Sequence, residues 1–459
     1  MPKGRRLAWL DAMRGFAALC VVFDHMGGLV LQRLHNDVYR VIDTGQYGVF
    51  VFFLVSGYII PASLERRGSV RGFWVGRGFR LYPLYILAIA LSILAYKTGY
   101  GAIHGAQNSP KTWAFALPFM MSNMLNGANV PNVIWTLSFE MVFYLLLTAL
   151  FTFRVHRFSA GYALTAMIAA VALGGLLPVS GLNDLHVFGH WTGERRIALL
   201  ADAGIFIGLA LAVTGRQRLR AVGVLIAAGT GLTLLLFNTS YPGPGTGLVI
   251  LGLMFTGTML YRAEQGQMAW KHALAVAAAV LVLAIAEGVW HGPGWVPGHV
   301  AQWRIQWISC LVLAAATFAI GMALRHKRVP GWLAWLGLIS YSVYLLHPII
   351  LNAYRSVPTF HQPHPFPIQV LLAAGIVAVV LASSTITYYV IESPMQKTGH
   401  KLARFLQARF GPDAIPAPDP VQASDAVQAS GVIPASGAIP APDAIQARPP
   451  VPAEVQPGR

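Results

Sequence analysis

The chain has 459 residues, of which 56% are hydrophobic and 11% are charged, and its mean hydropathy is +0.57. A soluble protein of this length would expose far more charge, so this balance indicates a membrane protein with many spans. The net charge of +16 comes from short Lys and Arg clusters between apolar runs, which is typical of positive-inside loops and argues against nucleic-acid binding.

Twelve apolar runs are candidate membrane-spanning helices, although the shorter ones have fewer than the roughly 20 residues that a crossing needs. They lie at 10–31, 45–60, 79–96, 134–153, 160–177, 197–213, 221–237, 245–260, 273–289, 303–324, 335–352 and 368–391. Threading the loops alternately, from a cytoplasmic N-terminus, collects most Lys and Arg in the cytoplasm. We therefore predict an all-α transmembrane helix bundle of about 10–12 spans with both termini cytoplasmic.

The first run contains the stretch LDAMRGFAALCVVFDHMGG, which carries charge inside an otherwise apolar segment. The preceding MPKGRR is basic and no small-residue cleavage site follows, so we expect a retained anchor. On an α-helix, Arg14 and His25 fall on one face and are separated by roughly 16 Å. A snorkelling Arg14 and a packing His25 would be a structural explanation. With Asp11 and Asp24 beside them, we favour a functional path, since ionisable groups inside a membrane tend to mark function.

The segment SLERRGSVRGFWVGRGFRLYP, residues 63–83, is predicted to be a cytoplasmic loop that leads into a span. It has more arginines than a positive-inside loop requires, and Arg77 and Arg80 are three residues apart at the start of the span. With Trp74 and several glycines, this density also suits an anionic ligand such as a nucleotide phosphate. Both explanations stay open here.

The run 113–127 breaks the alternation, because a span there would reverse every later loop, so we expect a re-entrant or interfacial segment on the outer side. The next span carries Trp135 and Glu140. A carboxylate inside an apolar helix needs a partner. Since His25 lies at a comparable predicted depth, we hypothesise a contact between Glu140 and His25.

The stretch ISYSVYLLHPII places Ser340, Tyr344 and His347 on one helical face. Pro348 follows directly and would free backbone carbonyls, so a structural and a functional role are both open for His347. The final span closes with YYVIESP, where Glu392 could pair with a loop arginine at the cytoplasmic end.

After about residue 411 the composition changes to Ala, Pro, Val, Gln and Ser, and AIPAPD occurs twice. This segment lacks the aromatic content of a core, so we expect a transmembrane domain over 1–400 and a disordered tail over 411–459. The two cysteines, Cys20 and Cys310, lie in apolar runs and indicate neither a disulfide framework nor a metal site.

Six stretches, in order, resemble the acyltransferase 3 family of integral membrane acyltransferases. They are LDAMRGFAALCVVFDH, VFFLVSGYII, RGFRLYP, WTLSFEMVFY, SYSVYLLHP and IESP, and the resemblance covers essentially all of residues 7–396. The family pattern often has Gly where this chain has Ala12, a change too small to cast doubt on activity. Some relatives carry a fused extracytoplasmic hydrolase-like domain, and we expect this chain to represent the stand-alone branch.

The resemblance implies transfer of an acyl group, usually acetyl, from cytoplasmic acyl-CoA to a hydroxyl of a carbohydrate or glycosylated acceptor. It also implies a multi-pass protein of the bacterial inner membrane, surrounded by membrane lipid. Acyl-CoA would be a co-substrate, with no permanently bound cofactor and no metal. The family's first-span arginine and histidine correspond to Arg14 and His25, and its Arg-x-x-Arg pair corresponds to Arg77 and Arg80.

These residues suit the chemistry of O-acylation. His25 would be the general base, because imidazole titrates near neutrality, and Glu140 or Asp24 would orient its ring as a triad acid does. The candidate catalytic residues are His25, Arg14 and Glu140, and the candidate CoA-binding residues are Arg14, Arg77 and Arg80. The candidate substrate-binding residues are Tyr344, His347 and Trp135.

A transporter or flippase of a lipid-linked sugar would explain the spans and the buried charges equally well. The sequence shows no evident inverted repeat, however, and the arginine cluster would have no obvious role in transport. A purely structural scaffold would not explain why Arg14 and His25 share a face. The identity of the acceptor and the length of the acyl chain stay open.

Overall fold

The computed structural model describes residues 8–100, 124, 131, 133–177, 193–237, 242–292, 300–357, 364–411 and 413. Met1–Ala414 forms one compact unit. A second unit, Ile415–Arg459, contains most of the predicted tail and lies outside the described residues. The predicted re-entrant segment 113–127 also lies outside them, apart from Met124.

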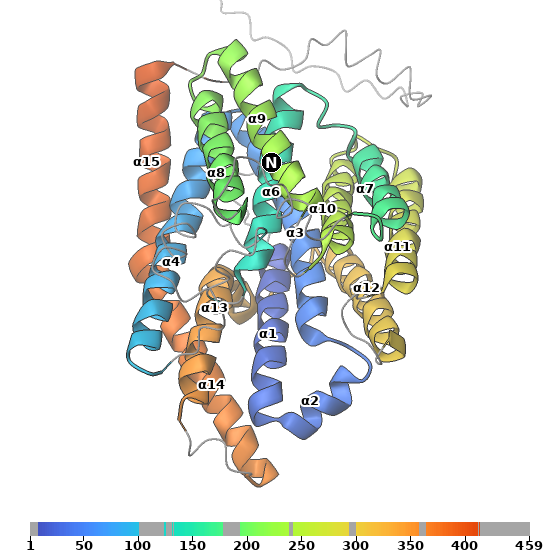
Figure 1. Cartoon of the computed structure of the whole chain (residues 1–459), viewed down its shortest axis with the longest axis vertical. Helices are drawn as coiled ribbons and strands as arrows, with labels where there is room; N and C mark the ends of the chain where they lie inside the picture. Colours follow the sequence, from blue (N-terminus) through green and yellow to red (C-terminus); the bar gives the residue numbers. More distant parts are fainter. Residues whose placement is uncertain are drawn as a thin grey trace, which may run out of the picture. The chain divides into compact units, whose positions relative to one another are not determined.

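Every regular element within the described ranges is helical (Figure 1). In chain order the helices are α1 (Ala8–Val30), α2 (Gln32–Tyr39), α3 (Thr44–Arg67), α4 (Val70–Lys97), α6 (Ile134–Thr152), α7 (Ser159–Leu173), α8 (Gly193–Ala212), α9 (Gln217–Leu236), α10 (Pro244–Glu264), α11 (Trp270–His291), α12 (Val300–Ala323), α13 (Gly331–Arg355), α14 (Phe366–Thr387) and α15 (Ser393–Phe410). A π-helical turn, η4 (Tyr388–Glu392), joins α14 to α15.

Ten of the twelve predicted runs coincide with helices to within about four residues at both ends. The exceptions are α3, which continues seven residues beyond its run, and α4, which begins nine residues before its run. Ten helical segments of the described chain are long and apolar enough to cross a membrane. The two shorter apolar helices are α7 and the part of α8 over Ile197–Ala212. With 15 residues, α7 is about 22 Å long, less than the roughly 30 Å of a bilayer's hydrocarbon core. The predicted all-α bundle is confirmed.

The loops rich in Lys and Arg gather at one end of the bundle. Arg262, at the end of α10, donates a hydrogen bond of 2.6 Å to Glu65 near the end of α3. His156, in the loop after α6, lies 3.8 Å from the same carboxylate. Arg71, at the start of α4, donates to the carbonyl oxygen of Val213 after α8 at 2.8 Å. These contacts join loops that the sequence analysis assigns to one side of the membrane.

The arginine-rich segment 63–83 is helical, contrary to the predicted loop. α3 continues to Arg67, and the break before α4 is confined to Gly68 and Ser69. Gly68 has a φ of 61°, the left-handed conformation that glycine favours after a helix, and the Ser69 hydroxyl caps α4 by accepting a backbone hydrogen bond of 2.8 Å. The Gly-Ser pair is the local signal for this sharp corner, which fixes the spacing of the arginines on either side.

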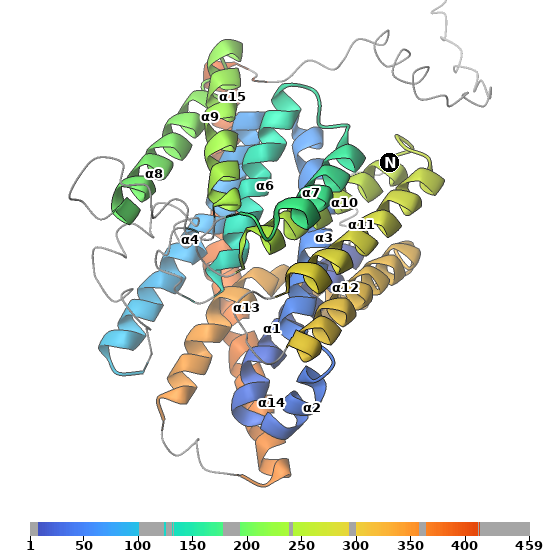
Figure 2. The ribbon, with the colours of Figure 1, turned by 45° about the vertical axis from the view of Figure 1, so that its right-hand side comes forward.

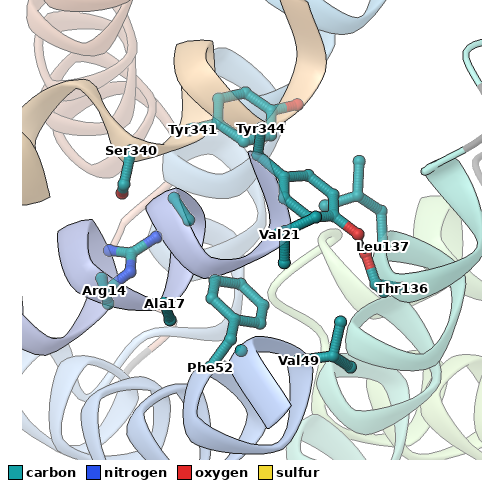
Figure 3. A pocket seen from close by; sticks show the side chains of 12 residues that line it. Arg14, Ala17, Val21, Val49, Phe52, Thr136, Leu137, Ser340, Tyr341 and Tyr344 are labelled. Atoms are coloured by element: carbon teal, nitrogen blue, oxygen red, sulfur yellow. Dashed lines mark hydrogen bonds between the residues drawn. The ribbon is translucent and has the colours of Figure 1, made fainter. Parts of the chain in front are cut away.

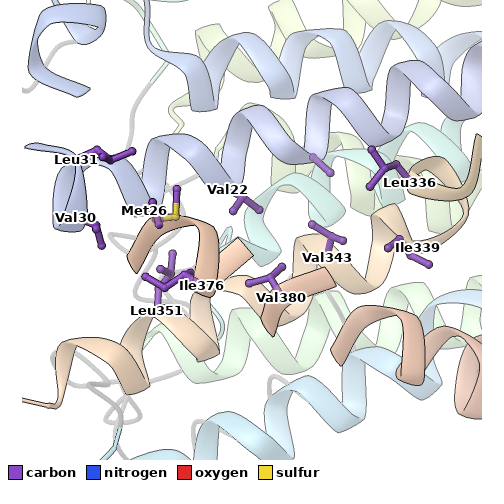
Figure 4. Close-up of a cluster of buried hydrophobic side chains, with 12 residues drawn as sticks. Val22, Met26, Val30, Leu31, Leu336, Ile339, Val343, Leu351, Ile376 and Val380 are labelled. Atoms are coloured by element: carbon purple, nitrogen blue, oxygen red, sulfur yellow. The ribbon is translucent and has the colours of Figure 1, made fainter. Parts of the chain in front are cut away.

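α1 lies between α3 and α13 in both views (Figures 1 and 2). α1, α13 and α14 share a buried apolar cluster (Figure 4). Its members include Val22, Met26, Ile339, Val343, Ile376 and Val380. The cluster holds the three helices together along the stretch that contains His25 and His347.

The backbones of α1 and α13 approach each other closely. A Cβ atom on Gly337 would lie 2.0 Å from the carbonyl oxygen of Asp11, and one on Gly15 would lie 2.7 Å from Cβ of Leu336. Glycine leaves no side chain between the helices, so they pack at short distance, as small residues allow in membrane bundles. α1 and α13 run in the same direction, so the turns that follow the glycine contacts also lie side by side, including those that carry His25 and His347.

Candidate active site

Four helices line a narrow pocket beside Arg14, whose cavity volume is about 20 Å³ (Figure 3). The residues lining it come from α1, α3, α6 and α13 and include Arg14, Val21, Phe52, Thr136, Ser340 and Tyr344. The lining is mostly apolar, with a guanidinium and a few hydroxyls. Each of the four helices carries one of the stretches that suggest acyl transfer, so the fold brings four distant parts of the chain to one place.

The pocket follows one stripe of α1. Arg14, Ala17, Ala18 and Val21 line it in succession, and His25 lies one turn beyond Val21. Eleven residues turn an α-helix by three full turns plus about 20°, so His25 continues the stripe that starts at Arg14. The two side chains therefore sit at opposite ends of a path of roughly 16 Å along α1.

His25 pairs with a second histidine. Its Nδ1 lies 2.9 Å from Nε2 of His347 on α13, and the two rings meet edge to edge, with centroids 5.0 Å apart and planes 29° from parallel. His347 is fully buried, and its Nδ1 lies 3.0 Å from the carbonyl oxygen of Val343. Tyr344, which lines the pocket, presents its ring edge-on to His347 at 6.0 Å. The pocket thus leads toward the imidazole pair.

Neither of the two carboxylates expected beside His25 is hydrogen-bonded to it in the described part of the chain. Asp24 lies 3.3 Å from Nε2 of His35 and accepts a hydrogen bond of 3.4 Å from the Thr44 hydroxyl. Glu140 instead lies in the electrostatic surroundings of Arg14. The expected contact between Glu140 and His25 is therefore replaced, because the close packing of α1 and α13 puts an imidazole against His25.

The predicted phosphate-binding arginines lie in a cationic cluster on α3 and α4. The charges of Arg66, Arg77 and Arg80 all act on Arg67. Arg77 packs over the rings of Phe73 and Tyr144, with centroid distances of 5.2 and 4.9 Å. Among the described ion pairs, none involves these four arginines. Such mutually repelling cations favour an anionic ligand.

Arg14 connects this cluster to the pocket. The charge of Arg80 acts on it, and its guanidinium lies 5.6 Å from the ring centroid of Phe52. Its Nε is buried and has no hydrogen-bond partner among the described residues. A buried donor without a partner at the mouth of a pocket is a natural contact for a polar ligand atom.

Arg71 differs from its neighbours because it is structural. It is 4% exposed, and besides its bond to Val213 its backbone N–H donates to the Asp413 carboxylate at 2.7 Å. The Ser69 hydroxyl donates to the same carboxylate, and Arg220 donates to the carbonyl oxygen of Asp413 at 2.8 Å. Part of the predicted tail, Gly411 and Asp413, is therefore packed into the folded unit.

Glu392 lies in a setting that the sequence did not indicate. It belongs to the π-helical turn, is buried and accepts a hydrogen bond from the Ser342 hydroxyl of α13. The cations that act on Glu392 are Arg80 and Arg14, which lie on helices rather than in a loop. π-helical turns occur frequently at functional sites, and this one directs a carboxylate toward the arginine side of the pocket.

Trp135 packs edge-on against Phe139, with ring centroids 6.2 Å apart, and is not one of the residues lining the pocket. The next residue, Thr136, does line it and donates a hydrogen bond of 2.8 Å to the Tyr344 hydroxyl. Of the three predicted substrate-binding residues, Tyr344 therefore lines the pocket, His347 holds His25, and Trp135 lies beside the wall.

Comparison with known proteins matches residues 7–388 to the family model described as an acyltransferase domain. Nodulation protein 10 of Rhizobium leguminosarum bv. viciae is 31% identical over 38% of this chain and 51% of its own length. Acyltransferase MdmB of Streptomyces mycarofaciens is 27% identical over 31% of this chain and 39% of its own. O-acetyltransferase OatA of Staphylococcus aureus is 24% identical over 42% of this chain and 34% of its own.

The alignments span about half the length of these relatives or less. No solved structure matches the chain. The family match, in contrast, extends from the start of α1 to the π-helical turn and includes all four helices that line the pocket. The chain belongs to the acyltransferase 3 family of membrane proteins.

Proposed function

We propose that this protein is an O-acyltransferase of the bacterial inner membrane. It would transfer an acyl group, with acetyl as the first candidate, from cytoplasmic acyl-CoA to a hydroxyl of a carbohydrate or glycosylated acceptor. The observation that carries the proposal is the pocket that runs along α1 from Arg14 toward the pair of His25 and His347. The similarity to the O-acetyltransferase OatA of Staphylococcus aureus supports O-acetylation.

The donor would bind from the arginine side. Arg77 and Arg80 would hold phosphates of CoA through charge-assisted hydrogen bonds, which are the stronger kind. Arg14, with its unpaired Nε, would contact the donor where it enters the pocket. The extended thioester arm would then pass Phe52 and Tyr344 and bring its carbonyl to His25.

The acceptor would approach His25 from the other end of this path. Nε2 of His25 takes the proton of the acceptor hydroxyl as the oxygen attacks the thioester carbonyl carbon. The C–O ester bond forms, the C–S bond breaks, and the proton passes from His25 to the CoA sulfur. Tyr344 would line the reacting region, and Trp135, at the start of α6, is proposed to contact the acceptor.

Label transfer tests the proposal directly. Membranes containing the protein would be incubated with radiolabelled acetyl-CoA and candidate glycan acceptors, and the acceptor fraction counted. We expect His25→Ala to lower transfer by about 10²–10⁴-fold, the usual contribution of a general base. His272→Ala serves as the matched control because His272 is an exposed histidine of α11.

Transfer that survives His25→Ala would remove His25 as the base. Wild-type membranes that label no acceptor but move a lipid-linked sugar across sealed vesicles would replace the proposal with transport.

A further inference from the structure

We infer that His347 is the positioning residue of His25, taking the place that a carboxylate holds in a catalytic triad. By fixing the tautomer of His25, it leaves Nε2 of that ring able to accept a proton. This inference rests on the proposed function, in which His25 is the base. The observation that carries it is the chain of contacts from His25 through His347 to the carbonyl oxygen of Val343.

The direction of these two hydrogen bonds follows from the last group in the series, the carbonyl oxygen of Val343. The carbonyl oxygen of Val343 can only accept, so Nδ1 of His347, 3.0 Å away, carries a proton and donates it. In a neutral ring the other nitrogen of His347, Nε2, is then an acceptor. Nδ1 of His25, 2.9 Å from that acceptor, must donate. The neutral ring of His25 therefore has its lone pair on Nε2.

His347 is kept neutral by its surroundings. It is fully buried, and its hydrogen bonds and ring contacts in the described chain are with the His25 ring, the Tyr344 ring and the carbonyl oxygen of Val343. A buried imidazolium without a carboxylate partner would be costly. The charged groups that act on His25 itself are Asp24 and Arg355. Asp24 is already engaged by His35 and Thr44, so the fold offers His25 a neutral orienting partner.

This arrangement separates two functions that a triad acid combines. A carboxylate both orients the imidazole and compensates the positive charge that forms on it. His347 orients the ring through one acceptor nitrogen and a fixed ring plane, and it brings no negative charge. Loss of His347 should therefore lower the rate of the chemical step and leave acyl-CoA binding unchanged.

Two variants of similar length test this role. His347→Gln retains an amide oxygen that can accept from Nδ1 of His25, whereas His347→Met fills similar space with a sulfur that is only a weak acceptor. We expect kcat to stay within about tenfold of wild type for Gln and to fall by about 100-fold for Met, with KM for acetyl-CoA unchanged in both. Equal losses of kcat in the two variants, which a purely structural role of His347 predicts, would overturn the inference.

Thermal unfolding of both purified variants should give similar midpoints, so that the difference in kcat reports the acceptor atom rather than folding. In a His25→Ala background, His347→Met should cause no further loss, because a positioning residue acts only through the residue it positions. A further loss in that background would contradict the inference while leaving the proposed function intact.

A spectroscopic readout is independent of activity. With ¹⁵N-labelled histidine, the signal that disappears in His25→Ala should show a protonated Nδ1 and an unprotonated Nε2 at neutral pH. The opposite tautomer would overturn the inference even if His25 proves to be the base. Conversely, label transfer that survives His25→Ala, together with the expected tautomer, would reject the proposed function and keep the assigned hydrogen-bond pattern.

Discussion

The contact between the backbones of α1 and α13 makes Gly337→Ala a sharp perturbation. The added Cβ would lie 2.0 Å from the carbonyl oxygen of Asp11, whereas ordinary contact begins at 3.4 Å, a difference of 1.4 Å. The obstructing atom belongs to a helix backbone and cannot rotate away. The two helices must therefore separate by roughly 1.4 Å, or one of them must distort.

Such a separation acts on stability and on the site together. Overpacking a tight interior costs about 1–3 kcal/mol, and a backbone obstacle places this variant near the upper end, at about 3 kcal/mol. Moved apart by the same amount, His25 and His347 would go from 2.9 Å to about 4 Å, beyond the length of a hydrogen bond. Transfer should then fall about as far as it does in His347→Met.

The assay is thermal unfolding of purified protein in detergent, with label transfer measured on the same samples. Gly375→Ala on α14 is the matched control, because a Cβ there meets nothing within 4 Å. It should stabilise the protein by roughly 0.5–1 kcal/mol through helix propensity alone. If Gly337→Ala unfolds and transfers as wild type does, the close approach of α1 and α13 and its role in pairing the histidines are refuted.

Three further outcomes follow from other parts of the molecule. Arg77→Ala should raise KM for acetyl-CoA by about 10- to 100-fold through loss of a charge-assisted phosphate contact, while KM for the acceptor stays constant; equal changes in both would contradict its donor role. Glu65→Gln leaves Arg262, 3% exposed, without its carboxylate, and should lower the free energy of unfolding by about 3 kcal/mol in a denaturation assay, whereas an unchanged midpoint would show that the pair contributes nothing. Burial and then the charge of Asp24 raise the pKa of Asp43 to about 6 from 3.8, so the folded state binds this proton more tightly and stability should fall as pH rises from about 4 to 6. Asp43→Asn keeps the N-cap of α3 and should abolish that step in a pH series of unfolding midpoints; a step that persists would assign it to another group.

The sequence is sufficient to predict the spans and the stripe of α1. Both depend on local properties, the length of apolar runs and the helical period, and neither requires knowledge of what packs against them. The relation between Arg14 and His25 is local in the same sense, because one helix holds both residues.

The partner of His25 could not be predicted in this way, because His347 is 322 positions further along the chain. Depth in the membrane suggested Glu140, but helix packing decides which side chain of a neighbouring span faces the ring. The same limit applies to the arginines. Nothing local distinguishes Arg71, which joins Val213 and Asp413, from Arg77, whose guanidinium instead lies over the Phe73 and Tyr144 rings.

The bond between Asp413 and the start of α4 has a consequence for how the chain is made. The family match ends at residue 388, yet the corner that precedes Arg77 is closed by a carboxylate 25 residues later. During synthesis α4 leaves the ribosome long before Asp413 is added to the chain. The arginine side of the pocket is therefore completed only when nearly the whole membrane unit has been synthesised, and a chain that stops at the family boundary leaves this corner open.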